Sequence, residues 1–306
     1  ASAMALGAQL FRERDRAFAA LLEKKARAAY ELGRAHPGAC QGTMYGSPYF
    51  YEEENWTDDM ELGAAQLFEL TREPRYRAEA VDYARMEPVT PWMGTDTARH
   101  YEWFPWHNNG HYEIWRAGGT YEKRLMADFY RRGVALVAAR ADNGFRIGIP
   151  FIWCSNNLLI SFATQARLYR DMTGDTTYRA YEQAAIDWLF GANPWGTSMI
   201  VGYPAGGVAP RDPHSVISKE LGWRIMTGGL VDGPVYRSIY DHLAGLKLSR
   251  PDPFAPFNTG FVVYHDDVGD YSTDEPIMDG TASLTYLMSA LSPQTTTTRA
   301  TPATSK

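Results

Sequence analysis

The chain has 306 residues, and its 45% of hydrophobic and 22% of charged residues are typical of a folded protein with an ample core. The net charge of −6 argues against nucleic acid and anionic membranes as partners, and no apolar run reaches the roughly 18 residues of a membrane span. Two cysteines, Cys40 and Cys154, are too few for a disulfide framework. Nine Trp and nineteen Tyr suit the apolar faces of sugar rings, although large cores use aromatic residues too.

The chain opens with ASAMALGAQLF, which has no initiator methionine and no signal peptide and reads as the inside of an alanine-rich helix. We therefore expect a processed or excised chain. Apolar residues at helical spacing predict helices over residues 11–32, 57–70, 158–172, 178–190 and about 281–291. Thr57 is the expected N-cap of the second helix, and Gly191 with Pro194 ends the fourth.

Two segments repeat each other, FELTREPRYRAEA at 68–80 and YRDMTGDTTYRAYEQA at 169–184. Each has a helix that ends near Thr, a short turn, and Tyr-Arg-Ala opening the next helix. Repeated helical hairpins must stack on their neighbours to bury their apolar faces, which predicts a solenoid or a closed ring. From about residue 194 to residue 281 the pattern changes to long Gly/Pro-rich loops, where function tends to lie.

The loop segment HDDVGDYSTDEP, residues 265–276, holds five carboxylates and no Lys or Arg. Solvated charges, a hard-cation site and acid–base chemistry all remain open, although no EF-hand spacing fits. The aromatic neighbours Tyr264 and Tyr271 favour a partly buried loop. A buried acid needs a partner or a task, and burial raises its pKa toward that of a general acid.

Three further segments carry candidate chemistry. HYEWFPWHNNGHYEIW at 100–115 places His107 and His111 four residues apart, but without HExxH it is a weak zinc site; its aromatics with Asn and His suit a sugar cleft. The loop 193–215 offers Trp195 and His214, although a lone His in a loop is more often a structural hydrogen-bonding group. Asp58 and Asp59 fall in a first helical turn, where the helix dipole favours acids, or they bind calcium.

In this order the segments resemble glycoside hydrolase family 9, largely cellulases acting on β-1,4-glucans. FRERDRAFAALLEKKARAAYELG, SPYFYEEENWTDDMELGAAQLFELT, WCSNN and GANPWGTSMIVGYP each look like a family segment. The most specific likeness is Tyr264-x-Asp266, then four residues, Tyr271, then three residues and Glu275. The resemblance implies an all-α fold, an (α/α)6 toroid-like barrel that lacks its first helices, over residues 1–292. The Thr/Pro-rich residues 293–306 are expected to be a linker or disordered tail.

The resemblance also implies the roles of individual residues. Glu275 would be the general acid, supported by Asp266 and by His214 of the Pro-His loop. The expected substrate-binding residues are Trp103, Trp106, Trp153, Trp195 and Tyr271. Asp58 and Asp59 match a pair that binds calcium in some members, a structural ion rather than a required cofactor. The protein is further expected to be secreted, with a carbohydrate-binding module beyond the tail.

The sequence departs from the family pattern in several places. Ser215 stands where an Arg usually follows His214, Asp274 replaces the usual Asn before Glu275, and Pro-Ile-Met follows Glu275. Family members are inverting enzymes whose base lies in an early Asp-Ala-Gly-Asp motif, which this chain does not contain. Asp267-Val-Gly-Asp270 superficially resembles that motif, and chain reach does not exclude either Asp as a substitute base.

The sequence therefore predicts hydrolysis of β-1,4-glucan with Glu275 as the acid, and weak or no activity if these 306 residues are the whole molecule. The rival hypothesis is a non-catalytic β-glucan-binding protein that uses the same aromatic cleft. A different helical-ring enzyme, such as a sugar epimerase or an unsaturated-uronide hydrolase, does not explain the Asp-x₄-aromatic-x₃-Glu spacing.

Overall fold

The computed structural model describes residues 1–38, 56–94 and 108–292. Its body consists of α1 (Ser2–Phe11), α2 (Arg16–Ala35), α3 (Thr57–Thr71), α4 (Pro74–Met86), α5 (Pro91–Gly94), α6 (Asn109–Ala117), α7 (Thr120–Arg140), α8 (Ser155–Thr173) and α9 (Arg179–Leu189). Cys40, Trp103, Trp106, His107 and the tail 293–306 lie outside the described residues. Within the three described ranges, no helix is long and apolar enough to cross a membrane.

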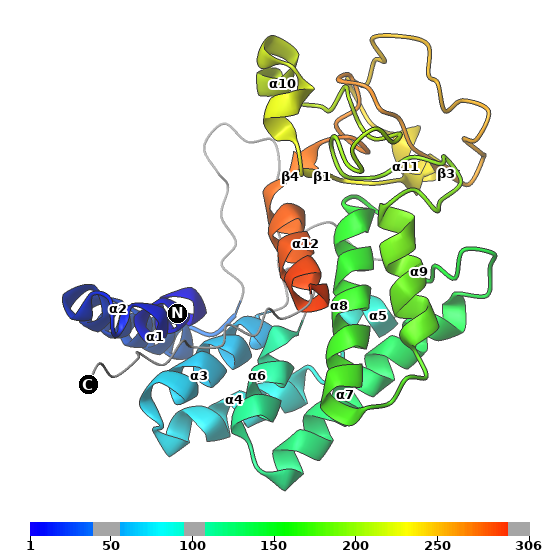
Figure 1. Cartoon of the computed structure of the whole chain (residues 1–306). Helices are drawn as coiled ribbons and strands as arrows, with labels where there is room; N and C mark the ends of the chain where they lie inside the picture. The colour runs from blue at the N-terminus through cyan, green and yellow to red at the C-terminus, as the bar shows by residue number, and fades with distance from the viewer. Residues whose placement is uncertain (39–55, 95–107, 293–306) are drawn as a thin grey trace, which may run out of the picture.

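The body is a series of helical hairpins packed side by side (Figure 1). α1 pairs with α2, α3 with α4, α6 with α7, and α8 with α9. α3 also packs on α1 and α6, while α8 packs on α7 and on the last helix, α12 (Met278–Leu291). The stacked hairpins predicted from the sequence repeat are therefore present.

The two repeated turns have the same hydrogen bonds. In each turn a Thr hydroxyl, of Thr71 or Thr173, donates to the carbonyl four residues earlier and accepts the N–H two residues later. The next residue, Arg72 or Gly174, is left-handed with φ of 59° or 75°. The left-handed residue ends the helix and reverses the chain, so a similar sequence gives a similar hairpin.

Two predicted details of the first helices are wrong. Residues 11–32 do not form one helix, because the chain turns after α1 and α2 begins behind Asp15, whose carboxylate caps Phe18 N at 2.9 Å. Thr57 is the first residue of α3 rather than its cap, and its hydroxyl instead donates to the Glu87 carboxylate at 3.0 Å.

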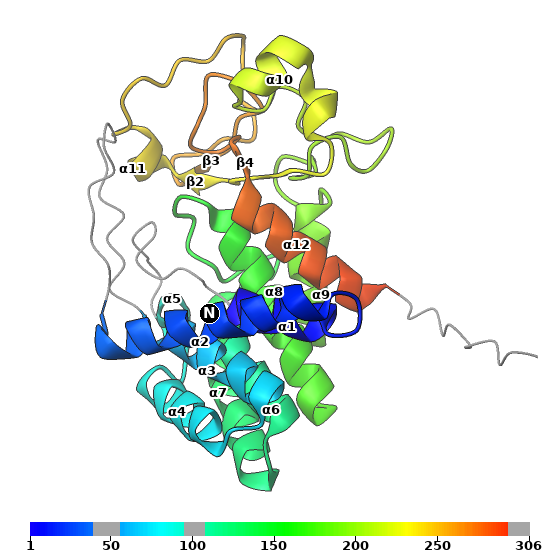
Figure 2. The ribbon, with the colours of Figure 1, turned by 90° about the vertical axis from the view of Figure 1, so that its left-hand side faces the viewer.

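A layer of loops covers one end of the helical body, and α12 runs from this layer into the body (Figures 1 and 2). We call it the loop layer, residues 190–277. It contains α10 (Val216–Leu221), the 3-10 helix η1 (Trp223–Met226), α11 (Arg237–Tyr240), β1 (Leu230–Val231), β2 (Val235–Tyr236), β3 (Val262–Val263) and β4 (Pro276–Ile277). β1 pairs with β4 and β2 with β3, both antiparallel.

The two larger apolar cores of the described residues support these parts. One lies around α3 and includes Tyr30, Leu67, Tyr76 and Met126. The other lies around α8 and extends into the loop layer; it includes Leu158, Phe162, Trp188, Met199 and Tyr264. The loop layer is thus anchored on the α8 core.

Candidate active site

Glu275 is positioned by the short β1–β4 ladder. Val231 lies opposite Pro276, so Asp232 directly after β1 faces Glu275 directly before β4. The N–H of Asp232 donates to the carbonyl of Glu275 at 3.0 Å. The backbone of Glu275 is therefore fixed by a strand pair instead of lying in a free loop.

The N-terminus of α8 holds this ladder in place. The Asn156 amide donates to the carbonyl of Val231 at 2.8 Å, and the Asn156 N–H donates to the carbonyl of Asp232 at 3.0 Å. Gly233 has φ of 93°, and a Cβ there would lie 2.5 Å from the Asn156 side chain. Only glycine lets the chain come this close to α8.

Three ring side chains surround this part of the loop layer. The ring of Trp153 stacks on Tyr271 with centroids 5.7 Å apart and planes at 25°, and the ring of His214 meets Tyr271 edge-on at 6.0 Å. The Tyr271 hydroxyl donates to the carbonyl of Ala244 at 2.7 Å. The structure thus brings together three residues that lie far apart in the sequence.

His214 is fixed at its backbone and at its ring. Its N–H donates to the carbonyl of Asp274 at 2.9 Å, and its Nδ1 lies 2.5 Å from the carbonyl of Val268. A carbonyl only accepts, so Nδ1 carries the hydrogen in this contact. In the neutral ring Nε2 is then left as an acceptor.

The Glu275 side chain is exposed, yet its surroundings shift its pKa upward. Desolvation by the neighbouring groups raises the pKa above the usual value, and the nearby charge of His214 opposes the rise. Behind it, Asp232 is 1% exposed, and burial together with the charge of Glu275 raises the pKa of Asp232 well above the usual value. The thiol of Cys154 donates to Asp232 at 3.3 Å. The sequence analysis did not identify this buried acid, because it lies 43 positions from Glu275 (275 − 232) and only the strand register brings the two together.

Asp266 ties a neighbouring loop to the Glu275 segment. Its carboxylate accepts the N–H groups of Arg211 at 3.0 Å and Asp212 at 2.7 Å, just before His214. The guanidinium of Arg250 lies 3.6 Å away. Burial raises the pKa of Asp266, whereas the two N–H donors and Arg250 lower it. Asp266 is thus placed to position the His214 loop.

Asp267 and Asp270 belong to the segment that superficially resembles the Asp-Ala-Gly-Asp motif. Both carboxylates accept several hydrogen bonds from neighbouring residues. Asp267 accepts hydrogen bonds from the backbone of Ser249, Arg250 and Gly269 and from the Ser249 hydroxyl. Asp270 accepts from Ser272 and Thr273 and lies 2.7 Å from the ring of His265. Both are 3% exposed or less. They hold the loop together, and His265, which the sequence analysis overlooked, is part of that framework.

Comparison with known proteins places the chain in a family. The model of glycosyl hydrolase family 9 matches residues 1–288. The chain belongs to glycosyl hydrolase family 9.

Curated relatives within family 9 are distant. Endoglucanase 3 of Oryza sativa subsp. japonica is 24% identical over 247 residues, covering 70% of this chain and 46% of the relative. Endoglucanase A of Bacillus pumilus is 24% identical over 301 residues, covering 93% of this chain and 42% of the relative. The chain therefore spans less than half the length of these curated relatives.

A solved structure confirms the fold. AaCel9A, in complex with cellobiose-like isofagomine, matches 95% of this chain and 53% of that chain with a TM-score of 0.71 and 22% identity. The predicted (α/α)6 barrel is thus confirmed over about half of a solved family 9 chain.

Trp195 does not lie with Trp153 and Tyr271. It is 5% exposed, its indole N–H donates to Asn258 at 2.8 Å, and its ring packs on Trp188 and Tyr264. It lines a separate aromatic cavity of about 240 Å³ whose lining includes none of Glu275, His214 and Tyr271. The loop 193–198 turns the Trp195 side chain inward. Its ring therefore packs in the α8 core and not beside the Trp153–Tyr271 stack.

Asp58 and Asp59, the expected calcium pair, differ in their exposure to solvent. Asp58 is 3% exposed and its carboxylate accepts the N–H of exposed Asp59 at 3.0 Å. Burial raises the pKa of Asp58 well above the usual value, and the charge of Glu87 adds to this. In the part of the chain that the structure describes, no group of three His, Cys, Asp or Glu could hold a metal ion. These residues do not fit a calcium site by themselves, and the calcium expectation stays a prediction.

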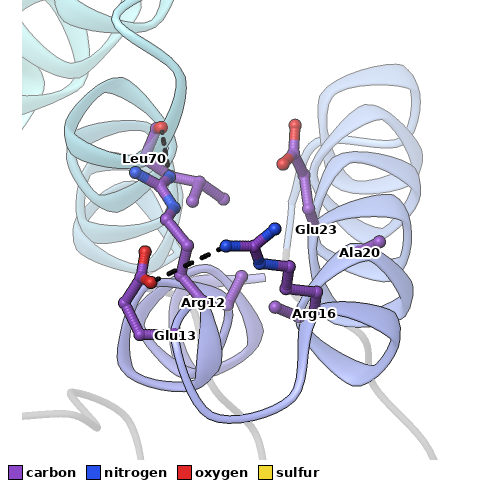
Figure 3. Close-up of a pocket in the computed structure, with 8 residues that line it drawn as sticks. Arg12, Glu13, Arg16, Ala20, Glu23 and Leu70 are labelled. Carbon is purple, nitrogen blue, oxygen red and sulfur yellow. Dashed lines mark hydrogen bonds and ion pairs between the residues drawn. The ribbon is translucent and has the colours of Figure 1, made fainter.

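A second cavity, of about 300 Å³, lies between α1, α2 and α3 (Figure 3). Its charged side chains already interact with other groups. Arg12 donates to the carbonyl of Leu70 at 3.2 Å, and Arg16 lies 4.0 Å from Glu13. The hydrogen bond of Arg12 connects the end of α1 to α3. The lining of this cavity includes no residue of the Glu275 site.

Proposed function

We propose that this family 9 chain takes part in the hydrolysis of β-1,4-glucosidic bonds in cellulose or a related β-glucan, with Glu275 as the general acid of an inverting reaction. The observation that supports it is the Glu275 carboxyl itself. It has a raised pKa and directly precedes β4 of the β1–β4 pair, with His214 and the Trp153–Tyr271 stack nearby. A carboxyl with a raised pKa near aromatic side chains suits a sugar whose glycosidic oxygen must be protonated.

The proposed substrate follows from the aromatic side chains and from a relative. The stacked rings of Trp153 and Tyr271 are partly exposed and offer apolar surface to a sugar. The solved relative AaCel9A binds a cellobiose-like isofagomine. A chain of glucose units is therefore the substrate that we propose for this site.

In the proposed reaction, Glu275 gives its proton to the glycosidic oxygen while the bond from that oxygen to the anomeric carbon breaks. A water attacks the anomeric carbon from the opposite face and loses a proton to a second carboxylate. That base must stand roughly 6.5–9.5 Å from the acid. Asp266, Asp267 and Asp270 are each committed to backbone N–H donors. We propose that the base is none of these three, and that catalysis needs another carboxylate.

The test is the release of reducing sugar from a soluble β-glucan and from cello-oligosaccharides by the chain and by its Glu275→Gln variant. A hydrolase of this kind loses its release in the variant. Release that persists undiminished in Glu275→Gln contradicts the assigned role.

The second candidate is a non-catalytic β-glucan-binding protein. The burial of Asp266, Asp267 and Asp270 favours it, since each of these acids near Glu275 already accepts hydrogen bonds from the protein. It predicts that wild type and Glu275→Gln bind cello-oligosaccharides equally in calorimetry and release no sugar. Loss of binding in Trp153→Ala in the same assay identifies the shared aromatic surface.

A further inference from the structure

Asp274, the residue before Glu275, is an acid in an unusual position. Its side chain is 0% exposed, and its Oδ1 accepts the Tyr264 hydroxyl at 3.3 Å. Its carboxyl also meets the carboxyl of Asp266. Its Oδ2 receives no hydrogen bond from any donor in the described ranges. A buried carboxylate oxygen that receives no hydrogen bond is costly.

Asp266 is the better of the two sites for a negative charge. It accepts the N–H groups of Arg211 and Asp212, and the guanidinium of Arg250 lies 3.6 Å away. Asp274 has a single hydroxyl donor. When two carboxyl groups share a buried place, one of them keeps its proton, and the better-solvated group ionises.

We propose that Asp266 and Asp274 share one proton, carried by Asp274 and donated to Asp266, and that this pair positions His214 and Glu275. Asp274 is bonded to Glu275 in the chain, and its carbonyl accepts the His214 N–H at 2.9 Å. Asp266 holds the two residues that lead into Pro213 and His214. The shared proton thus links Asp266, which holds the loop before His214, to Asp274, which precedes Glu275.

The surroundings agree with this assignment. Burial raises the pKa of Asp274 well above the usual value, and the charges of Asp266 and Asp270 raise it further. The titratable and charged groups that face the pair are Asp270, Tyr264, Asp212, Arg250 and, through Asp270, His265. The cations among them lie on the Asp266 and Asp270 sides. Loss of the shared proton would leave two charges in contact and separate the loops.

The inference deepens the proposed function, on which its catalytic meaning rests, but the proton itself is tested without catalysis. The experiment is a carboxyl-carbon NMR titration of the chain labelled at Asp, with assignments from single variants. We expect Asp274 to titrate well above the ordinary value near 3.9. In Asp266→Asn, which removes the neighbouring charge, the Asp274 titration should fall by at least about one pH unit. Exposed Asp142→Asn, far from the pair in sequence, is the control and should leave it unchanged.

Asp274→Asn tests the positioning role. The amide has the same shape and keeps a donor toward Asp266 without a proton to lose. In wild type the ring signals of His214 should shift as Asp274 ionises, and in Asp274→Asn that shift should be absent. An Asp274 signal that titrates near 3.9, or one unmoved by Asp266→Asn, overturns the inference. If Asp266→Asn does not fold, the wild-type titration alone decides. A failure of sugar release leaves these titrations unaffected, so the two proposals fail separately.

Discussion

The helical body and the loop layer are held together by different contacts. In the body, apolar residues such as Leu67 and Leu158 pack at helical spacing, and the repeated Thr turns close the hairpins. In the loop layer, buried carboxylates accept backbone N–H groups, as Asp267 does from Ser249 and Gly269. A segment with little regular structure is thus held in place by buried carboxylates that accept backbone N–H groups, where the body uses apolar packing between helices.

The largest expected effect is on chemistry in the loop layer. Glu275→Gln should slow the hydrolysis of phenyl β-cellobioside by roughly 10²–10⁴-fold, the usual contribution of a general acid. It should slow dinitrophenyl β-cellobioside far less, because that leaving group needs no proton. The rates of the two substrates in wild type and variant check this. Equal losses on both would mean that Glu275 does not act as the acid.

A core truncation should show how the helical body is stabilised. Leu67 is fully buried in the core around α3, so Leu67→Ala should lower the free energy of unfolding by about 2–5 kcal/mol. Urea denaturation followed by circular dichroism measures it. A loss below about 1 kcal/mol would contradict a close-packed body.

The contact of the β1–β4 ladder with α8 gives the next test. Gly233→Ala combines φ of 93° with a Cβ only 2.5 Å from Asn156, so it should cost about 2–4 kcal/mol of stability. Gly228→Ala is the matched control, with φ of 91° and open space around the added Cβ. It should cost only about 1 kcal/mol. Equal losses in the free energy of unfolding for the two variants would show that the ladder is not in close contact with α8 at Gly233.

The smallest expected effect is the difference in stability between removing a buried acid of the loop layer, Asp267, and an exposed acid of the body, Asp171. Burial tends to raise the pKa of Asp267, but the N–H groups of Ser249 and Gly269 hold it below the usual value. The native state thus binds fewer protons, and this stability is present above about pH 4 and is lost as the pH falls further. Asp267→Asn should cost roughly 1.5–3 kcal/mol at pH 7 and progressively less below pH 4. Asp171→Asn, which removes an exposed ion pair with Arg167 on α8, should cost about 0.5 kcal/mol or less. A constant Asp267→Asn cost down to pH 3 would contradict this account.

The sequence predicted the helical body better than the loop layer for a physical reason. Helices are local, so apolar spacing and the Thr repeat predicted α3, α8 and α9 to within a few residues. The break at Asp15 was missed, although residues 12–16 (RERDR) are all charged and interrupt the apolar pattern there. In the loop layer the signature spacing predicted Glu275 as the acid, which stays a prediction; the structure places Glu275 directly before β4 with His214 nearby.

The remaining contacts of the site depend on long-range pairing. Asp232 faces Glu275 only through the β1–β4 register, and Asp266 reaches Arg211 from 55 positions away. Trp195 was expected beside the substrate because it is a Trp in a Gly/Pro-rich loop, but the loop turns it into the α8 core. Residue type identifies the side chains that are chemically able to bind substrate or catalyse a reaction. The tertiary structure decides which of them meet.

The measurement that tests the account most directly is the pKa of the Glu275 carboxyl, from carboxyl-carbon NMR of the chain labelled at Glu and assigned with Glu275→Gln. The structure predicts a value above the ordinary 4.3, because desolvation outweighs the charge of His214. A raised pKa favours the protonated form that a general acid needs. A value at or below 4.3 would contradict this prediction and the role of Glu275 as the proton donor.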